Sequence, residues 1–384
     1  MKKRAFKLGS SLSALALLLI FGFSVSGHAA STGGGGKISP ANPVIVFRYG
    51  NDIFVADRDG GNQTVVYRNV YAGNSAAWCS PDGSDIIFQH QLNGQPGVYR
   101  LPIIDISSGK RTVRVGAPQL VAKTPFLNAF VSARCSPVLI DGEIKVVYDA
   151  QPADGAGNAL PYTNLYLADV GVTEDGSPTL LLSGNATQPS LVLSSPSWSP
   201  LGDRIAFSST PWGVDGQSDV KVMQISGSAN PLSLILALGQ VSPLSSSPQD
   251  GADFFWPRWS NRSNRDLIAV DAGPSHSELN SGRELWLIPV DGPTSAYSLA
   301  YDKVEGVGRF QPSWSPDDSQ LIYVRNPRKG MCGDKGSATG GVIGLSNVNG
   351  GATIEPINKN GTLCDEIPLI SKDGRFPDWW RGAP

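Results

Sequence analysis

Short apolar runs separated by turns rich in glycine and proline recur along the chain after residue 30, and no apolar stripe with a helical period accompanies them. Runs of one kind directly follow a tight turn and read DIIFQ, KVVYD, RIAFS, LIAVD and QLIYV. Runs of a second kind come later in each stretch and include NLYLADV, VKVMQIS and ELWLIPVDG. Apolar runs of this length bounded by turn residues are typical of β-strands. The pattern therefore predicts an all-β fold.

A tryptophan motif marks the beginning of each group of strands. PSWSP occurs at residues 196–200 and again at 312–316, and related segments are WCSPDG, RCSPVLIDG, PRWSNRSNRD and PDWWRG. Aligned on the motif, the anchor positions are Cys79, Cys135, Trp198, Trp259, Trp314 and Trp379, at intervals of 55 to 65 residues. With the anchor strand included, each repeat supplies four short strands, which is typical of one blade of a β-propeller.

The two ends of the repeat array complement each other. Three strand-like segments, PVIVFRYG, NDIFVADRDG and TVVYRN, precede the first anchor, whereas no strand follows the last anchor at Trp379. A blade assembled from both ends explains the two irregularities and leaves no open sheet edge between them. The sequence thus predicts a six-bladed β-propeller over residues 43–384, with four antiparallel strands per blade and a C-terminal strand that closes the last blade against three N-terminal strands.

The repeat of P-S-W-S-P-D-G, an I-A-F or I-Y-V strand and a D-G hairpin resembles that of the TolB-like propeller family, from about Pro43 to Arg381. Such propellers serve as interaction platforms, as lids on peptidases and, less often, as lyases, so the resemblance is more specific for fold than for function. The pattern departs from the family at Cys79 and Cys135, where the anchor tryptophan is replaced.

The tryptophan anchors are interpreted as core residues, because an indole fills the wedge between adjacent sheets with a large apolar area. The four cysteines contain no CxxC spacing and favour disulfides in an exported protein. Cys332 and Cys364 flank one loop-rich segment and form the better candidate pair, which leaves Cys79 with Cys135. Cys79 and Cys135 are expected at equivalent positions of adjacent blades, where their side chains would point the same way relative to their own sheets rather than at each other. Two interpretations of this pair are therefore kept, a disulfide and two buried thiols.

The N-terminal thirty residues have the layout of a secretory signal, with MKKRAFK before the apolar run Leu12 to Val25 and SGHAA after it. Residues 31–42 form a glycine-rich linker. Loss of residues 1–30 removes four basic residues and takes the formal charge from −2 to −6. A basic face for nucleic acid is not indicated, and no later apolar run is long enough for a membrane span. We expect a periplasmic or secreted, monomeric protein.

Connection lengths predict which end of the blades binds a ligand. Turns after the anchor strand and between the third and fourth strands are mostly short. Connections between second and third strands, and those leading into the next blade, are long, as at Gln89 to Pro96, Gln151 to Tyr162 and Thr210 to Gln217. Long loops on one end of a scaffold are the usual place for binding residues. The binding candidates on the expected long-loop face are His90, Tyr162, Trp212, His276, Arg309, Arg328 and Lys329, although each taken singly is also consistent with an ordinary loop residue.

By resemblance to TolB-like platforms, the expected function is non-enzymatic binding of a protein or peptide partner at the cell envelope. The alternative is a propeller that binds or cleaves an extracellular polysaccharide at the channel mouth, with Trp212 stacking on sugar rings. No catalytic residue, metal site or cofactor is predicted. Only His90 and His276 remain beyond the signal, too few for a three-histidine metal site, whereas calcium bound by carboxylates in the channel is not excluded.

Overall fold

The computed structural model describes residues 44–70, 76–79, 83–106, 113–126, 132–171, 178–185, 189–213, 218–225, 231–237, 253–262, 264–273, 284–290, 297–298, 307–327, 342–349, 353–356 and 374–379. These residues form strands, turns and loops, and no helix occurs among them. The predicted all-β fold is therefore confirmed. The segments expected to be a signal and a linker, residues 1–30 and 31–42, lie outside the described residues, as do Cys332, Cys364, His276, Arg328 and Lys329.

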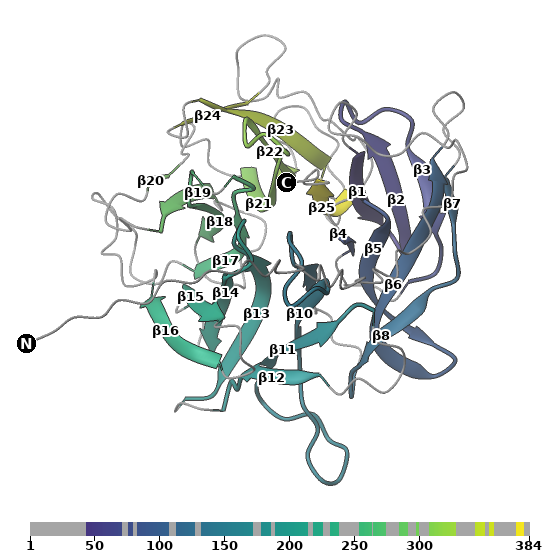
Figure 1. Cartoon of the computed structure of the whole chain (residues 1–384). Coiled ribbons are helices and arrows are strands. Elements are labelled where there is room, and N and C mark those ends of the chain that lie inside the picture. The colour runs from purple at the N-terminus through teal and green to yellow at the C-terminus, as the bar shows by residue number, and fades with distance from the viewer. Residues whose placement is uncertain are drawn as a thin grey trace, which may run out of the picture. The chain divides into compact units, whose positions relative to one another are not determined.

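The described strands form six antiparallel sheets, arranged as the blades of a propeller (Figure 1). The first sheet contains β25 (Gly374–Trp379), β1 (Val44–Tyr49), β2 (Asp52–Asp57) and β3 (Thr64–Tyr67). The second contains β4 (Ala76–Cys79), β5 (Asp85–Leu92), β6 (Gln95–Ile106), β7 (Val113–Val115) and β8 (Gln119–Lys123). The third contains β9 (Ala133–Cys135), β10 (Lys145–Ala150), β11 (Asn164–Asp169) and β12 (Thr179–Leu182).

The other three sheets repeat this order. The fourth contains β13 (Leu191–Trp198), β14 (Arg204–Pro211), β15 (Asp219–Ile225) and β16 (Pro231–Ala237). The fifth contains β17 (Asp253–Trp259), β18 (Leu267–Gly273), β19 (Glu284–Pro289) and β20 (Tyr297–Ser298). The sixth contains β21 (Val307–Trp314), β22 (Gln320–Pro327), β23 (Val342–Asn349) and β24 (Thr353–Pro356).

The inner strands are β25, β4, β9, β13, β17 and β21, one from each sheet. They contact one another in that order, and β21 contacts β25 in turn. Strand β25 also pairs antiparallel with β1, so that residues from the two ends of the chain share one sheet. The second sheet differs from the predicted four strands, because the long strand β6 pairs with β7 along one half and with β8 along the other.

Each inner strand places one residue opposite an aliphatic residue of the next strand in its sheet. The pairs are Trp78 with Ile86, Cys135 with Val146, Trp198 with Ile205, Trp259 with Ile268, Trp314 with Leu321 and Trp379 with Ile45. Trp198 packs with Val147 and Leu165 of the preceding sheet and with Phe207 of its own. Trp314 packs in the same way against Ala269 and Leu287. The anchor side chains therefore fill the wedges between consecutive sheets, where an indole buries a large apolar area.

The alignment of Cys79 with the anchor tryptophans is wrong by one residue. Trp78 holds the anchor register in β4 and packs against Ile53 and Val55 of the preceding sheet, whereas Cys79 lies in the cluster on the other side of β4. Successive side chains of a strand point to opposite faces. Cys79 consequently faces forward toward the third sheet, while Cys135, at the anchor position of β9, faces back toward the second.

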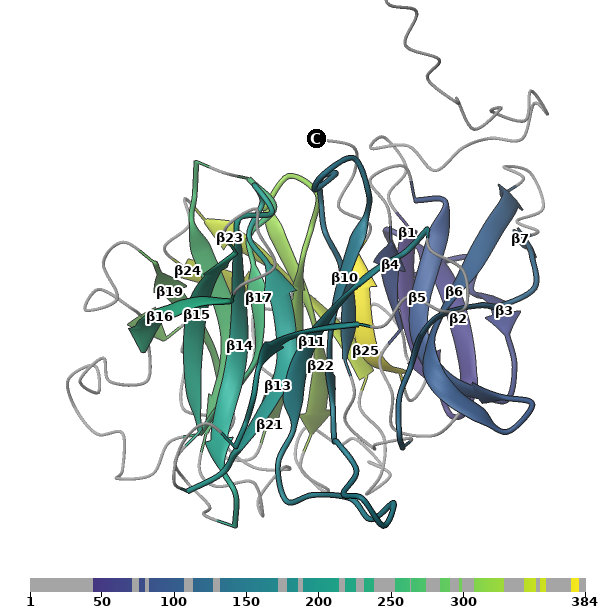
Figure 2. The ribbon, with the colours of Figure 1, turned by 60° about the horizontal axis from the view of Figure 1, so that its bottom comes forward.

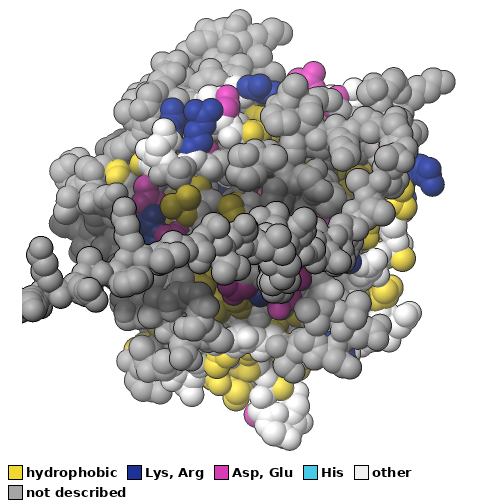
Figure 3. Space-filling model, viewed as in Figure 1, with side chains coloured by type: hydrophobic (Ala, Val, Ile, Leu, Met, Phe, Trp, Pro, Cys, Tyr) yellow, Lys and Arg dark blue, Asp and Glu magenta, His cyan; other side chains and the backbone are white. Residues whose placement is uncertain are grey.

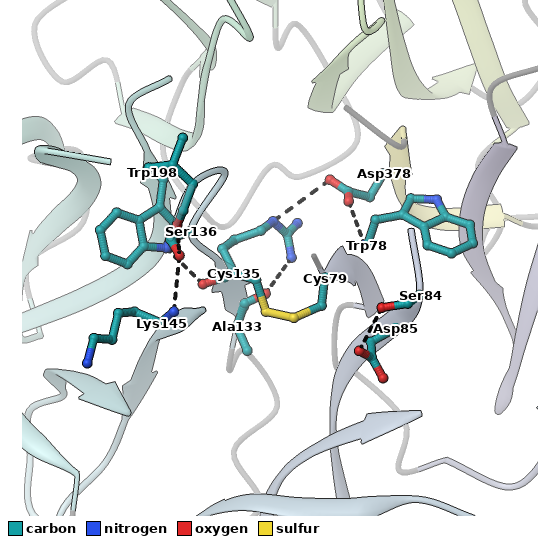
Figure 4. Close-up of a disulfide and its surroundings, with 12 residues drawn as sticks. Trp78, Cys79, Ser84, Asp85, Ala133, Cys135, Ser136, Lys145, Trp198 and Asp378 are labelled. Carbon is teal, nitrogen blue, oxygen red and sulfur yellow. Dashed lines mark hydrogen bonds and ion pairs between the residues drawn. A yellow bond between two sulfur atoms is a disulfide. The ribbon is translucent and has the colours of Figure 1, made fainter. Parts of the chain in front are cut away.

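Because Cys79 and Cys135 do not occupy equivalent positions, their side chains can face each other and form a bridge. Cys79 and Cys135 form a disulfide with their Cα atoms 5.0 Å apart (Figure 4). Both sulfur-bearing side chains are buried, and they share a cluster with Ala77, Val98 and Val146. The disulfide therefore links two neighbouring inner strands at a wedge whose described residues include no tryptophan.

The other five junctions between inner strands are joined by hydrogen bonds, which follow two alternating forms. In three of them the backbone N–H of a tryptophan donates to the side chain before the preceding anchor: Trp259 to Ser197, Trp379 to Ser313 and Trp78 to Asp378. In the other two the indole Nε1 donates to a backbone carbonyl: Trp198 to Arg134 and Trp314 to Arg258. The residue before each anchor thus determines which hydrogen bond joins two inner strands. Serine and aspartate accept the bond through the side chain, whereas arginine has no acceptor there and its backbone carbonyl accepts instead.

Candidate functional site

Because the strands of each sheet are antiparallel, the connections from second to third strands lie at the same end of the sheets as the connections that lead into the next inner strand. Examples of the first kind join β10 to β11 and β14 to β15. In Figure 2 the loop between β10 and β11 extends at the bottom, and the turn between β9 and β10 lies at the top. We call the bottom end in this view the long-loop face and the top end the short-turn face.

The predicted length of one long connection is wrong. Residues 89–96 were expected to form a loop, but β5 continues to Leu92 and β6 begins at Gln95, so that a two-residue hairpin turn joins them. Asn93 and Gly94 both have positive φ, which is the backbone conformation that such short hairpins require. His90 therefore lies in a strand, opposite Gly97.

The His90 side chain packs inside an aromatic cluster with Tyr67, Phe88 and Tyr99. The ring centroids of Tyr67, Phe88 and Tyr99 lie 5.7, 5.9 and 6.0 Å from that of His90. Burial lowers the pKa of His90, because the charged imidazolium is desolvated there. The environment favours a neutral histidine that packs between the first and second sheets, and His90 is the least suited of the described candidates to contact a ligand.

Trp212 is the most exposed aromatic candidate on the long-loop face. Its side chain is 45% exposed, directly after β14, and its backbone N–H donates to the carbonyl of Ser190 at 2.7 Å. Pro211 pairs with Leu191 at the start of the neighbouring strand β13. The backbone of Trp212 is thus fixed while its indole faces solvent.

Tyr162 lies near the same segment, on the other side of residues 190–191. The backbone N–H of the next residue, Thr163, donates to the Leu191 carbonyl at 3.2 Å. The loop that carries Tyr162 is ordered by Asp154, whose carboxylate accepts from the N–H groups of Ala156 and Asn158. The structure therefore brings Tyr162 and Trp212 to two sides of one backbone segment between the third and fourth sheets.

Arg309 also lies near the long-loop face, in β21, where it pairs with Arg325 of β22. It is half-buried and belongs to the start of its strand rather than to a loop. Three of the seven candidates, His276, Arg328 and Lys329, lie outside the described residues. Of the remaining four, the structure places Trp212 and Tyr162 on two sides of residues 190–191, whereas His90 lies in the second sheet.

A buried group of ionisable residues lies on two inner strands, β9 and β25, and on β10, and it was not predicted. Arg134 of β9 is almost fully buried, and its Nε lies 3.9 Å from Oδ1 of Asp378 in β25. Its Nη1 donates to the Ala133 carbonyl at 2.9 Å. Asp149 of β10 accepts from the backbone N–H of Ser132 at 2.8 Å. The one sequence signal for this group was an arginine inside an otherwise uncharged anchor segment, SARCSP.

Burial dominates the electrostatics of this group. It raises the pKa of Asp149 to about 8, although the N–H groups of Ser132 and Ser195 and the charge of Arg134 act in the opposite direction. Burial likewise lowers the pKa of Arg134, against the attraction of Asp378 and Asp149. Removing ions from water costs several kcal/mol each unless pairing is close. Asp378 and Asp149 both lie near the Arg134 guanidinium, and among the described residues no cluster of three or more potential metal ligands occurs.

Replacing Asp149 with asparagine should reduce the pH dependence of stability. Because its folded-state pKa is raised from 3.8 to about 8, protonated Asp149 stabilises the fold fully below about pH 4, and this contribution is lost as the pH rises through 8. Urea unfolding across this range should show a wild-type free energy that falls by at most about 1.4 kcal/mol per pH unit from this group. Asp149→Asn should flatten the profile, whereas the exposed control Asp141→Asn should retain it. Equal slopes for Asp149→Asn and wild type would contradict the assignment.

Comparisons with known proteins identify the fold. No family model and no curated protein matches the chain. Among solved structures, TolB from Acinetobacter baumannii matches 90% of this chain and 67% of its own, with 15% identity and a TM-score of 0.50. The fold is that of a TolB-like propeller.

Two further matches have lower TM-scores. A putative TolB from Agrobacterium tumefaciens matches 83% of this chain and 88% of its own, with 18% identity and a TM-score of 0.47. A puromycin-hydrolyzing peptidase from Mycobacterium tuberculosis matches 83% and 48%, with 11% identity and a TM-score of 0.43. At these identities the likeness concerns the fold alone. Among the described residues no helix is long and apolar enough to cross a membrane.

Proposed function

We propose that this chain is an exported, non-enzymatic propeller that binds a protein or peptide partner at the cell envelope through its long-loop face. The observation that carries the proposal is the exposed indole of Trp212, whose backbone is held against Ser190. Tryptophan and tyrosine offer large contact areas with few rotatable bonds, and they are enriched at the centres of protein interfaces. A fixed backbone reduces the ordering cost of binding.

The architecture supports this role as a rigid scaffold. We interpret the six sheets as six blades and the pairing of β25 with β1 as the closure between the chain ends. A ring closed in this way has short, protected sheet edges and holds its connecting loops in fixed positions. The leader-like residues 1–30 are the sequence feature behind the proposed export to the periplasm or the exterior.

Trp212→Ala should abolish partner binding without lowering stability. The indole is 45% exposed, so its removal should change the free energy of unfolding by less than about 0.5 kcal/mol. Affinity capture from an envelope extract should retain a specific protein on the wild-type chain and lose it on the variant. Leu180→Ala is the matched control, because Leu180 is also 45% exposed but lies on the outer strand β12.

Glycan-array binding distinguishes the proposed protein binding from the alternative, binding of a polysaccharide. A polysaccharide ligand that stacks on Trp212 would give array signals that Trp212→Ala removes, with no protein captured by the wild type. A captured protein that binds Trp212→Ala as well as wild type would reject the long-loop face as its contact surface.

A further inference from the structure

Two leucines are strongly exposed on the short-turn face, opposite the surface proposed above. Leu139 lies in the turn between β9 and β10 and is 62% exposed, and Leu201 lies in the turn between β13 and β14 and is 61% exposed. Both turns follow an anchor position, and they belong to adjacent sheets. Exposed apolar side chains are ordinary when scattered singly, but neighbouring ones form a surface that a partner can cover.

The two turns are in direct contact. Gly202, next to Leu201, has a positive φ of 71°, and a Cβ atom added there would lie only 2.8 Å from Cγ2 of Val138, next to Leu139. The backbone of one turn therefore packs on a side chain of the other. Leu139 and Leu201 are each next in sequence to a residue of this contact, and we call Val138, Leu139 and Leu201 the leucine patch.

Hydrogen bonds hold both turns in place. Ile140 and Glu143 exchange backbone hydrogen bonds of 2.8 and 3.1 Å, and Ser136 Oγ donates to the Val138 carbonyl at 2.8 Å. Gly202 N–H donates to the Ser199 carbonyl at 3.0 Å. The side chain of Ile140 packs on the cluster around Trp198. The exposed leucines are thus carried by ordered backbone, which lowers the entropy cost of docking a partner.

Acidic side chains border the leucine patch. Asp141 and Glu143 are exposed in the same turn as Leu139, and neither has an ion-pair partner among the described residues. Two basic side chains of the same two sheets are paired among the described residues, Lys145 with Asp169 and Arg204 with Asp203 and Asp266. Figure 3, which views the short-turn face, shows acidic side chains near its centre, with apolar and basic side chains beside them. Asp141 and Glu143 give the turn that carries Leu139 a negative charge.

We propose that the leucine patch is a second docking surface, for a partner segment in which an apolar side chain is flanked by lysine or arginine. The apolar anchor would cover Leu139 and Leu201, and the basic residues would lie over Asp141 and Glu143. Apolar burial supplies affinity at such a surface, while charge complementarity selects the partner and increases the association rate. This inference does not depend on Trp212 or on the long-loop face.

The test uses a phage-displayed library of random dodecapeptides selected on the full-length mature protein. Enriched peptides should contain Leu, Ile, Val or Phe next to Lys or Arg. Leu139→Ser combined with Leu201→Ser should weaken their binding at least about tenfold by fluorescence polarisation. Asp141→Asn combined with Glu143→Gln should weaken binding less and reduce its dependence on salt. The matched control is Ile104→Ser combined with Leu180→Ser, since these side chains are 59% and 45% exposed on other elements.

Three outcomes would overturn the proposal. The first is enrichment of peptides that bind the Leu139→Ser and Leu201→Ser variant as tightly as wild type, and the second is the absence of any enriched peptide. The third is dimerisation of the wild type in sedimentation that the leucine variant abolishes, because the occupant would then be a second copy of the chain. All substituted side chains are exposed, so an unchanged melting temperature verifies that each variant is folded.

Discussion

Replacing Cys79 and Cys135 together with alanine is expected to lower the free energy of unfolding by about 4 kcal/mol, from the loop-closure entropy of a bridge that spans 56 residues. The bridge restricts the unfolded chain, because residues 79 and 135 must stay together there. Alanine suits the site, since both cysteines are buried in an apolar cluster. Urea unfolding of the double variant and the wild type, both under non-reducing conditions, measures the difference.

The control for this experiment is the other candidate pair. Cys332→Ala combined with Cys364→Ala leaves the bridge between β4 and β9 intact and separates its effect from that of a general loss of cysteines. A loss below about 1 kcal/mol for the Cys79 and Cys135 variant would contradict a stabilising bridge at this junction. Because no described tryptophan lies in the wedge between the second and third sheets, we expect the unfolding of this variant to begin there.

The sequence predicted the strands well because their signals are local. Apolar runs such as KVVYD and RIAFS correspond to β10 and β14, and the pairing of β25 with β1 agrees with the unequal chain ends. Each of these features depends on the residues of one segment and its turn. The register between strands depends on which of two neighbouring side chains enters the wedge. For Trp78 and Cys79 the Ser-Pro motif predicted the wrong one.

The error at Cys79 shows how that choice is made. The segment WCSPDG can be aligned with PSWSP on its Ser-Pro pair, which selects Cys79, or on its tryptophan, which selects Trp78. The structure follows the tryptophan, because an indole buries far more apolar area in the wedge than a thiol does. At RCSP no tryptophan is adjacent to Cys135, so the cysteine takes the anchor position and meets Cys79 from the next strand.

The candidate site could be predicted only in part for a related reason. Trp212 follows a strand and precedes a glycine, so the sequence indicates a loop position at which the indole can be exposed. His90 was assigned to the long connection expected at Gln89 to Pro96, yet His90 continues β5 and packs on aromatic rings contributed by β3 and β6. The leucine patch depends on contact between turns that are about sixty residues apart, which no local pattern encodes.

Trp78→Ala and Trp379→Ala are each expected to lower the free energy of unfolding by about 3–5 kcal/mol, the usual cost of truncating a large buried aromatic side chain. Trp379 is nearly inaccessible to solvent and packs with Ile45, Phe47 and Ile322. Because these contacts join the C-terminal strand to the first and sixth sheets, the loss should appear in global unfolding. Urea titrations followed by circular dichroism measure both variants.

Trp212→Ala is the matched control, since it removes the same side chain from an exposed position. If β25 closes the ring, Trp379→Ala should destabilise the whole chain in one cooperative transition. A separate early transition, or a loss as small as that of Trp212→Ala, would mean that the C-terminal strand is dispensable and that the blades hold together without it. If Trp78→Ala lowered the free energy of unfolding only slightly, the assignment of Trp78 as the anchor of β4 would be wrong and Cys79 would be the anchor instead.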